Sequence, residues 1–346
     1  MTGPGARPYS TWTLWLFERL PLSPPWVGAL LGLSLYLVFL GYTYAFGPSV
    51  GVLAGSSIEN AWGAELILAL VTGFAPTVTT YTLRGSLRDL EDLRGALHCS
   101  DDEFAALRGE ITGYRAAPLR LVGTVGAVVS AFVAFDLDIW LDGRPPLGDP
   151  ALTWIVVRNS LNGWMVSRAL YLEITLARSF SRLGDRLGEV DLLDPDLLNT
   201  FGRRGLRSVL LWMLFVAFYS LLYTGNWAAD LLPIALVGIA AYGIIGFLLP
   251  VVGARRRIRS EKRAELVRVR TAIHDLRESV LRHEPDARPP GGQLADLLAY
   301  ESRIASVREW PFDAPTLLRW ALYVALGLSS WLGGALVERA LGTLLD

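Results

Sequence analysis

The chain has 346 residues, of which 52% are hydrophobic and only 19% are charged, and its mean hydropathy is +0.37. This balance is typical of a chain largely immersed in lipid and is rare in a soluble domain. The net charge of −1 provides no overall basic field for nucleic acid, and the single cysteine excludes an intramolecular disulfide and a cysteine-based metal centre within one chain.

Seven segments are apolar over about 20 residues, the length that a helix needs to cross a hydrocarbon core of about 30 Å. In chain order they are residues 26–46, 62–81, 118–140, 151–177, 206–223, 231–253 and 315–337. Charged and amide side chains dilute the apolar pattern in 62–81 and 151–177. The sequence therefore predicts an all-α, polytopic membrane protein with seven transmembrane helices.

Arginine is concentrated after the second, fourth and sixth predicted spans, whereas the loops after the first, third and fifth contain only Arg144. Loops rich in Lys and Arg stay on the cytoplasmic side, so we expect the N-terminus inside and the C-terminus outside. This orientation is opposite to that of G-protein-coupled receptors and microbial rhodopsins. The predicted location is the plasma (inner) membrane.

The cytoplasmic side is predicted to be helical, and it divides the chain into three parts. Residues 1–253 contain the first six spans, residues 254–314 form a cytoplasmic helical hairpin, and residues 315–346 contain the last span and an outside tail. Since 255–283 has no helix breaker, we expect the sixth span to continue into the cytoplasm as one rod.

Apolar residues recur on this rod at spacings of three and four, which places them on one side of the helix. They are Leu266, Val269, Ile273, Leu276 and Val280. The stripe is too short for a coiled-coil assignment. It either packs on other cytoplasmic helices of the same chain or joins subunits.

No catalytic or cofactor motif is present in the sequence. The histidines His98, His274 and His283 have no metal-binding spacing, and there is no phosphate-binding glycine loop, nucleophile elbow or dinucleotide fingerprint. We therefore expect neither an enzyme nor a resident cofactor or metal.

Polar residues inside predicted spans are costly and often mark function. The candidates for an intramembrane polar or ligand site are Glu65, Arg158, Asn162, Arg168 and Glu173. Glu65 and Arg158 either pair across the bundle or reach the headgroups separately. The span at 151–177 is the most polar of the seven and either lines an aqueous cleft or buries its polar groups in pairs.

Two further sets of residues are candidates for an ion pathway. Asp136 and Asp138 form an acidic outer mouth for cations or belong to an ordinary solvated loop. In the last span, small residues recur on one side of the helix at Gly327, Ser330, Gly333 and Gly334. Small residues allow close helix packing within a subunit, and they also leave room for water and ions in a symmetric pore.

The layout resembles the insect odorant and gustatory receptor type of seven-transmembrane ion channel. The shared features are the N-terminus inside, a polar fourth span, a tight turn at 226–230, a long cytoplasmic extension of the sixth span, a returning helix and a terminal seventh span. Where that family has a Tyr and aliphatic run ending in Gln-Phe, 326–335 reads Leu-Gly-Leu-Ser-Ser-Trp-Leu-Gly-Gly-Ala. The resemblance implies a homotetramer whose seventh spans surround a cation pore and whose cytoplasmic helices form the subunit contacts.

Three functional hypotheses follow from the sequence. The first is an oligomeric channel for cations, with or without gating by a ligand, whose seventh span lines the pore. The second is a secondary transporter or small-molecule-binding membrane protein with its site beside Arg158, Asn162 and Arg168. The third is a membrane signalling or scaffold protein whose basic cytoplasmic helices recruit partners or anionic lipid.

Overall fold

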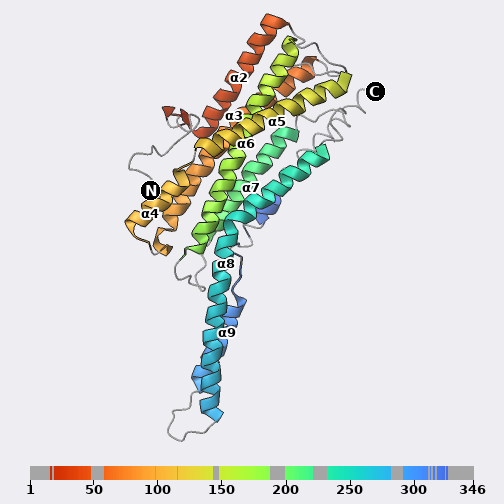
Figure 1. Ribbon diagram of the computed structural model, residues 1–346. Coiled ribbons are helices and arrows are strands. Elements are labelled where there is room, and N and C mark those ends of the chain that lie inside the picture. Colours follow the sequence, from red (N-terminus) through yellow and green to blue (C-terminus); the bar gives the residue numbers. More distant parts are fainter. Residues whose placement is uncertain are drawn as a thin grey trace.

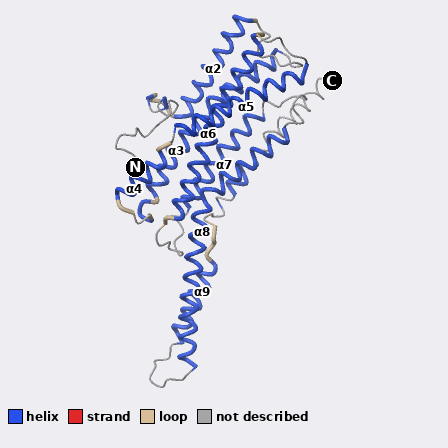
Figure 2. The backbone as a smooth tube through the Cα atoms, in the orientation of Figure 1, coloured by secondary structure: helices blue, strands red, loops and turns tan. Residues whose placement is uncertain are grey.

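The computed structural model describes most of the chain. The described residues are 16–17, 19–47, 58–97, 99–114, 116–142, 148–187, 199–220, 232–281, 291–310, 312, 315, 318–323 and 325. Within these ranges the chain is helix and short connections, with no strand, as Figure 2 shows. The all-α class predicted from the sequence is confirmed for this part of the chain.

The helices alternate in direction through one elongated bundle (Figure 1). They are α2 (Pro24–Phe46), α3 (Ile58–Asp92), the 3-10 turn η1 (Arg94–Ala96), α4 (Asp101–Thr112), α5 (Ala116–Asp142), α6 (Pro150–Asp185), α7 (Asn199–Ser220), α8 (Leu232–Leu281) and α9 (Gly291–Ser306). The helix α3 is central, since it contacts α2, α6 and α7.

Local sequence signals define several helix ends. Two prolines open α2, at positions where the missing N–H is not needed. The helix α2 is followed by the C-cap residue Gly47, whose φ of +104° is easily adopted only by glycine. A capping box starts α4, because the Ser100 hydroxyl accepts from the Glu103 N–H and the Glu103 carboxylate accepts from the Ser100 N–H.

The rod predicted to follow the sixth span is confirmed. The helix α8 is continuous over 50 residues, which corresponds to about 75 Å at the rise of an α-helix. Its first half lies in the bundle, and its second half projects beyond it with α9 packed alongside (Figure 1). The helix α4 lies at the same end of the bundle as this projection.

Three helical stretches among the described residues are long and apolar enough to cross a membrane. They are Pro24–Phe46, Trp62–Asp92 and Asp101–Val133. The apolar part of the third stretch belongs to α5, since α4 is rich in charge. The other four predicted spans remain predictions, and most of 315–337 lies outside the described residues.

The outer helices leave large apolar side chains uncovered. On α2, Leu37 and Val38 are 58% and 59% exposed, and on α5 Val128 and Phe132 are 62% and 66% exposed. By contrast, α3 is buried over most of 71–80. An apolar surface of this extent is uncommon on a protein surrounded by water.

Glycines allow the outer helices to approach the inner ones. A Cβ on Gly73 of α3 would collide with the carbonyl oxygen of Gly28 on α2, and a Cβ on Gly163 of α6 would collide with that of Gly126 on α5. Close backbone approach at small residues is the usual packing of helices in membranes.

Candidate functional site

Charged and polar side chains of α3, α6 and α7 meet in the interior of the bundle. We call this set the polar seam; its members are Glu65, Thr72, Asp89, Arg158, Asn162, Glu173, Arg204 and Arg207. Each of them forms a hydrogen bond or ion pair with another member on a different helix. The seam therefore joins the three helices through their side chains.

The end of the seam remote from α4 contains one ion pair and one neutral hydrogen bond. Glu65 of α3 pairs with Arg158 of α6; the Glu65 side chain is buried and that of Arg158 is partly buried. One turn along α6, the Asn162 Nδ2 donates to the Thr72 Oγ1 at 2.9 Å. The structure thus contains the ion pair that was one of the two interpretations of Glu65 and Arg158.

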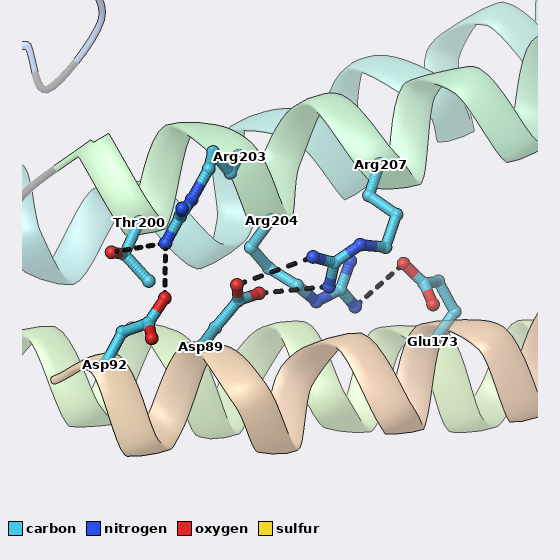
Figure 3. A network of polar contacts seen from close by, with 7 residues as sticks. All are labelled: Asp89, Asp92, Glu173, Thr200, Arg203, Arg204 and Arg207. Atoms are coloured by element: carbon cyan, nitrogen blue, oxygen red, sulfur yellow. Dashed lines mark hydrogen bonds and ion pairs between the residues drawn. The ribbon is translucent and has the colours of Figure 1, made fainter. Parts of the chain in front are cut away.

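The opposite end of the seam is built from arginines of α7 (Figure 3). The Arg204 Nη2 lies 2.9 Å from the Glu173 Oε1 of α6, and these side chains are 0% and 4% exposed. The two Nη atoms of Arg207 bind the two carboxylate oxygens of Asp89 at 3.0 and 3.4 Å. Arg203 and Asp92, 2.6 Å apart and about half exposed, form a further pair at the outer edge of the bundle.

The inner cluster of two guanidinium groups and two carboxylates is balanced in charge. Taking ions out of water costs several kcal/mol each, and pairing with additional hydrogen bonds offsets that cost. Gly85 makes room for one of these pairs, since a Cβ there would overlap the Arg207 guanidinium. The glycine at this position of α3 therefore allows Arg207 of α7 to reach Asp89.

The sequence analysis missed Arg204, Arg207 and Asp89 as members of a site. Both arginines were assigned to the cytoplasmic segment after the fourth span, although Arg207 falls within the predicted span 206–223; in the structure α7 begins at Asn199. A signal was present, because Phe201, Arg204 and Ser208 share one helical stripe and all three are buried. An arginine within an apolar stripe is a candidate buried charge.

Arg168 lies on another side of α6 from the seam. Its guanidinium is 4.0 Å from the centroid of the Trp164 ring, a cation–π contact. A Cβ on Gly123 of α5 would lie 3.0 Å from the Arg168 Cδ. The ligand site proposed beside Arg158, Asn162 and Arg168 is thus divided, since Arg158 and Asn162 bind α3 and Arg168 packs near α5.

Part of the apolar stripe on α8 packs against other residues of the same chain. Leu266 packs against the core and Val269 is buried, and Leu276 lines an open groove of about 670 Å³ together with Leu297 of α9. The prediction that the stripe joins subunits is untested, and the side chain of Val280 lies outside the described part of the chain.

The remaining site predictions fall outside what the structure describes. This applies to Gly327, Ser330, Gly333 and Gly334, and to the side chains of Asp136 and Asp138, whose backbone belongs to α5. Over the described residues, no group of three or more His, Cys, Asp or Glu side chains has an arrangement that could hold a metal ion.

These features define an all-helical bundle with a charged interior seam and three helices that could cross a membrane. Comparison of the chain with protein-family models, with curated proteins and with solved structures finds no match.

Proposed function

We propose that this chain is a multi-pass membrane protein with seven spans. The spans would be α2, the apolar part of α3, α5, α6, α7, the first half of α8 and the segment 315–337, with the N-terminus inside and the C-terminus outside. Two observations support this proposal. The outer faces of α2 and α5 are apolar and uncovered, and α4, the α8 projection and α9 share one end of the bundle.

Within this framework, the function best supported by the geometry is movement of a small ion or polar solute along the polar seam of each chain. One observation carries the proposal: three ion pairs, each with at least one buried partner, join α3, α6 and α7 towards both ends of the bundle. A buried ion pair is often no more stable than an apolar replacement of similar volume. Repeated use of such pairs between the same three helices therefore favours a role in passing polar solutes.

The seam also contains a neutral step next to the Glu65–Arg158 pair. Asn162 and Thr72 lie between the two charged ends, and their hydrogen bond is buried. A solute or ion crossing here would exchange its hydration shell for the amide and the hydroxyl. This pair is therefore the part of the seam that can be altered with the least disturbance of charge.

Flux through purified protein in proteoliposomes tests this proposal, with potassium, sodium and proton fluxes as the probes. We expect wild-type protein to carry at least one of them. Thr72→Val, which replaces the hydroxyl by a methyl group, should reduce that flux. Val128→Ala on the exposed face of α5 is the control and should retain it. Flux no greater than that of empty liposomes, or equal flux in Thr72→Val, would contradict the proposal.

A second candidate is an oligomeric cation channel in which 315–337 lines a pore on the symmetry axis. One observation favours it: residues 318–323 form a helical turn at the edge of α8, where Trp320 packs on Phe247 while Leu318 and Leu322 are exposed. Such a peripheral helix is free to meet its copies in other subunits.

The number of chains in the purified protein separates the two candidates. Native mass spectrometry from detergent and nanodiscs should give a stable tetramer if the channel exists, and flux should then be blocked by Gly334→Trp in the last span. A monomer would exclude a pore on a symmetry axis and would leave the seam as the pathway.

A further inference from the structure

Several buried polar atoms of α3 and α7, towards the α4 end of the seam, have no hydrogen-bond partner among the described residues. They are the Nε and Nη1 of Arg204 and the hydroxyl oxygens of Thr82, Ser86 and Ser208. All four side chains are at most 1% exposed. Leaving one buried donor or acceptor unpaired costs about 1–3 kcal/mol. Several such groups together therefore indicate that a further molecule forms hydrogen bonds with them.

Neighbouring threonines of α3 behave differently. The hydroxyls of Thr72, Thr77, Thr79 and Thr80 each donate to the backbone carbonyl four residues earlier, at 2.8 to 3.2 Å. Thr82 and Ser86 belong to the same helix and have such carbonyls within reach of an ordinary rotamer. Their hydroxyls instead make no hydrogen bond to any residue that the structure describes.

The unpaired hydroxyls of α3 share the side of the helix that carries Asp89. Thr82, Ser86 and Asp89 occupy successive turns on that side, and Asp89 binds Arg207 of α7. In Figure 3 the Arg204 side chain runs past Asp89 towards Glu173. The Ser208 hydroxyl faces α8 instead, since a Cβ on Gly246 would lie 2.7 Å from its Oγ. Arg204, Thr82 and Ser86 are therefore the unpaired groups on the sides of α3 and α7 that carry the seam.

The charges at this point select the kind of occupant. Arg204 is already paired with Glu173, and Arg207 with Asp89, so an additional anion would face two carboxylates and an additional cation two guanidinium groups. A small neutral molecule that both donates and accepts hydrogen bonds can pair with the N–H groups and with the hydroxyls. Buried water bonds otherwise unsatisfied polar groups in this way, with about three hydrogen bonds per molecule.

We infer that Arg204, Thr82 and Ser86 form an internal water-binding site that hydrates the inner part of the seam and exchanges with the solvent at the α4 end. The role of this site as the hydrated section of a solute path rests on the proposed function. The binding of water itself depends only on the contacts of α3, α6 and α7.

Thiol accessibility tests this site in the full-length protein in proteoliposomes. Cys99 is the only cysteine, so Cys99→Ser gives a background into which Thr82→Cys or Ser86→Cys is added, with a small charged methanethiosulfonate as the reagent. Thr80→Cys is the matched control, because Thr80 is equally buried on the same helix but its hydroxyl is bonded to the Pro76 carbonyl.

We expect Thr82→Cys and Ser86→Cys to react at least about tenfold faster than Thr80→Cys, because the reactive thiolate forms only where water reaches the sulfur. Equal rates at all three positions would overturn the site. Each variant is first checked for a single symmetric peak in gel filtration.

A structure of the wild-type protein that resolves ordered water provides a second test without substitution. Density within hydrogen-bond distance of the Arg204 Nη1 is expected, whereas a direct bond from Arg204 to Ser86 with no intervening density would overturn the inference. Fast labelling without any ion flux would retain the water site and remove the transport path; flux without selective labelling would do the reverse.

Discussion

The polar seam and the projecting α8–α9 hairpin are both held by ion pairs of similar length, but in very different surroundings. In the seam, Glu173 and Arg204 are 2.9 Å apart and almost fully buried. On the hairpin, Arg270 and Glu301 are 2.7 Å apart, with side-chain exposures of 66% and 24%. Because water screens the second pair and not the first, distance alone does not indicate how much either contributes to stability.

The largest effect is expected from breaking a seam pair on one side only. Glu173→Ala leaves the Arg204 guanidinium buried without its carboxylate, which should destabilise the fold by about 3–5 kcal/mol. The measurement is thermal unfolding of the detergent-purified protein, with a marked fall in the midpoint or loss of a monodisperse peak as the result.

A double substitution is the control for this prediction. Glu173→Leu combined with Arg204→Met removes both charges and retains most of the volume, so it should recover much of the lost stability. If Glu173→Ala unfolded at the wild-type temperature, the seam pair would be no more important than a surface pair, and the contrast with the hairpin would disappear.

An intermediate effect is expected where the hairpin joins the bundle. The Lys262 Nζ of α8 donates to the carbonyl oxygens of Ala305 and Val307, each at 2.7 Å, and so binds the C-terminal end of α9, where a positive charge is favourable. Lys262→Met retains the aliphatic stem and should cost about 1 kcal/mol, since the charged donor is partly solvated.

Hydrogen exchange localises this effect. Amides of 300–307 should exchange faster in Lys262→Met, while those of α3 stay unchanged. Arg263→Met, one position along and exposed, removes the same charge without touching α9 and should leave exchange at the wild-type rate. If exchange accelerated equally in both variants, the effect would come from the loss of charge and not from the loss of the Lys262 hydrogen bonds to α9.

The sequence predicted the helical class, the α8 rod and the pair of Glu65 with Arg158 as one of two alternatives, because each depends on a pattern within a single segment. Long apolar runs and the lack of a breaker over 255–283 are local features. The ion pair joins residues 93 positions apart, and it could be anticipated because a charge in each of two spans requires a partner.

The inner end of the seam could not be predicted from composition in the same way. Arg203, Arg204 and Arg207 have the same residue type and occur in one segment, yet the first is about half exposed and the second fully buried. Their different roles follow from the rotation of α7 against α3 and α6, which depends on packing. For the same reason, the sequence did not reveal that Arg168 lies apart from Arg158 on α6.

The smallest effect is expected from the hairpin pair itself. Arg270→Ala removes one N–H···O bond to Glu301, but water can solvate both groups, so unfolding should change by less than about 0.5 kcal/mol. Since the apolar contacts of α9 remain, the melting temperature should match that of the wild type within error, and raising the salt concentration should change neither protein. A loss comparable to that of Glu173→Ala would mean that the hairpin pair is shielded from water, as it would be if this face of α8 and α9 were covered by another subunit. The same measurement therefore tests the energetic contrast and gives an independent indication of subunit contacts on this face of the hairpin.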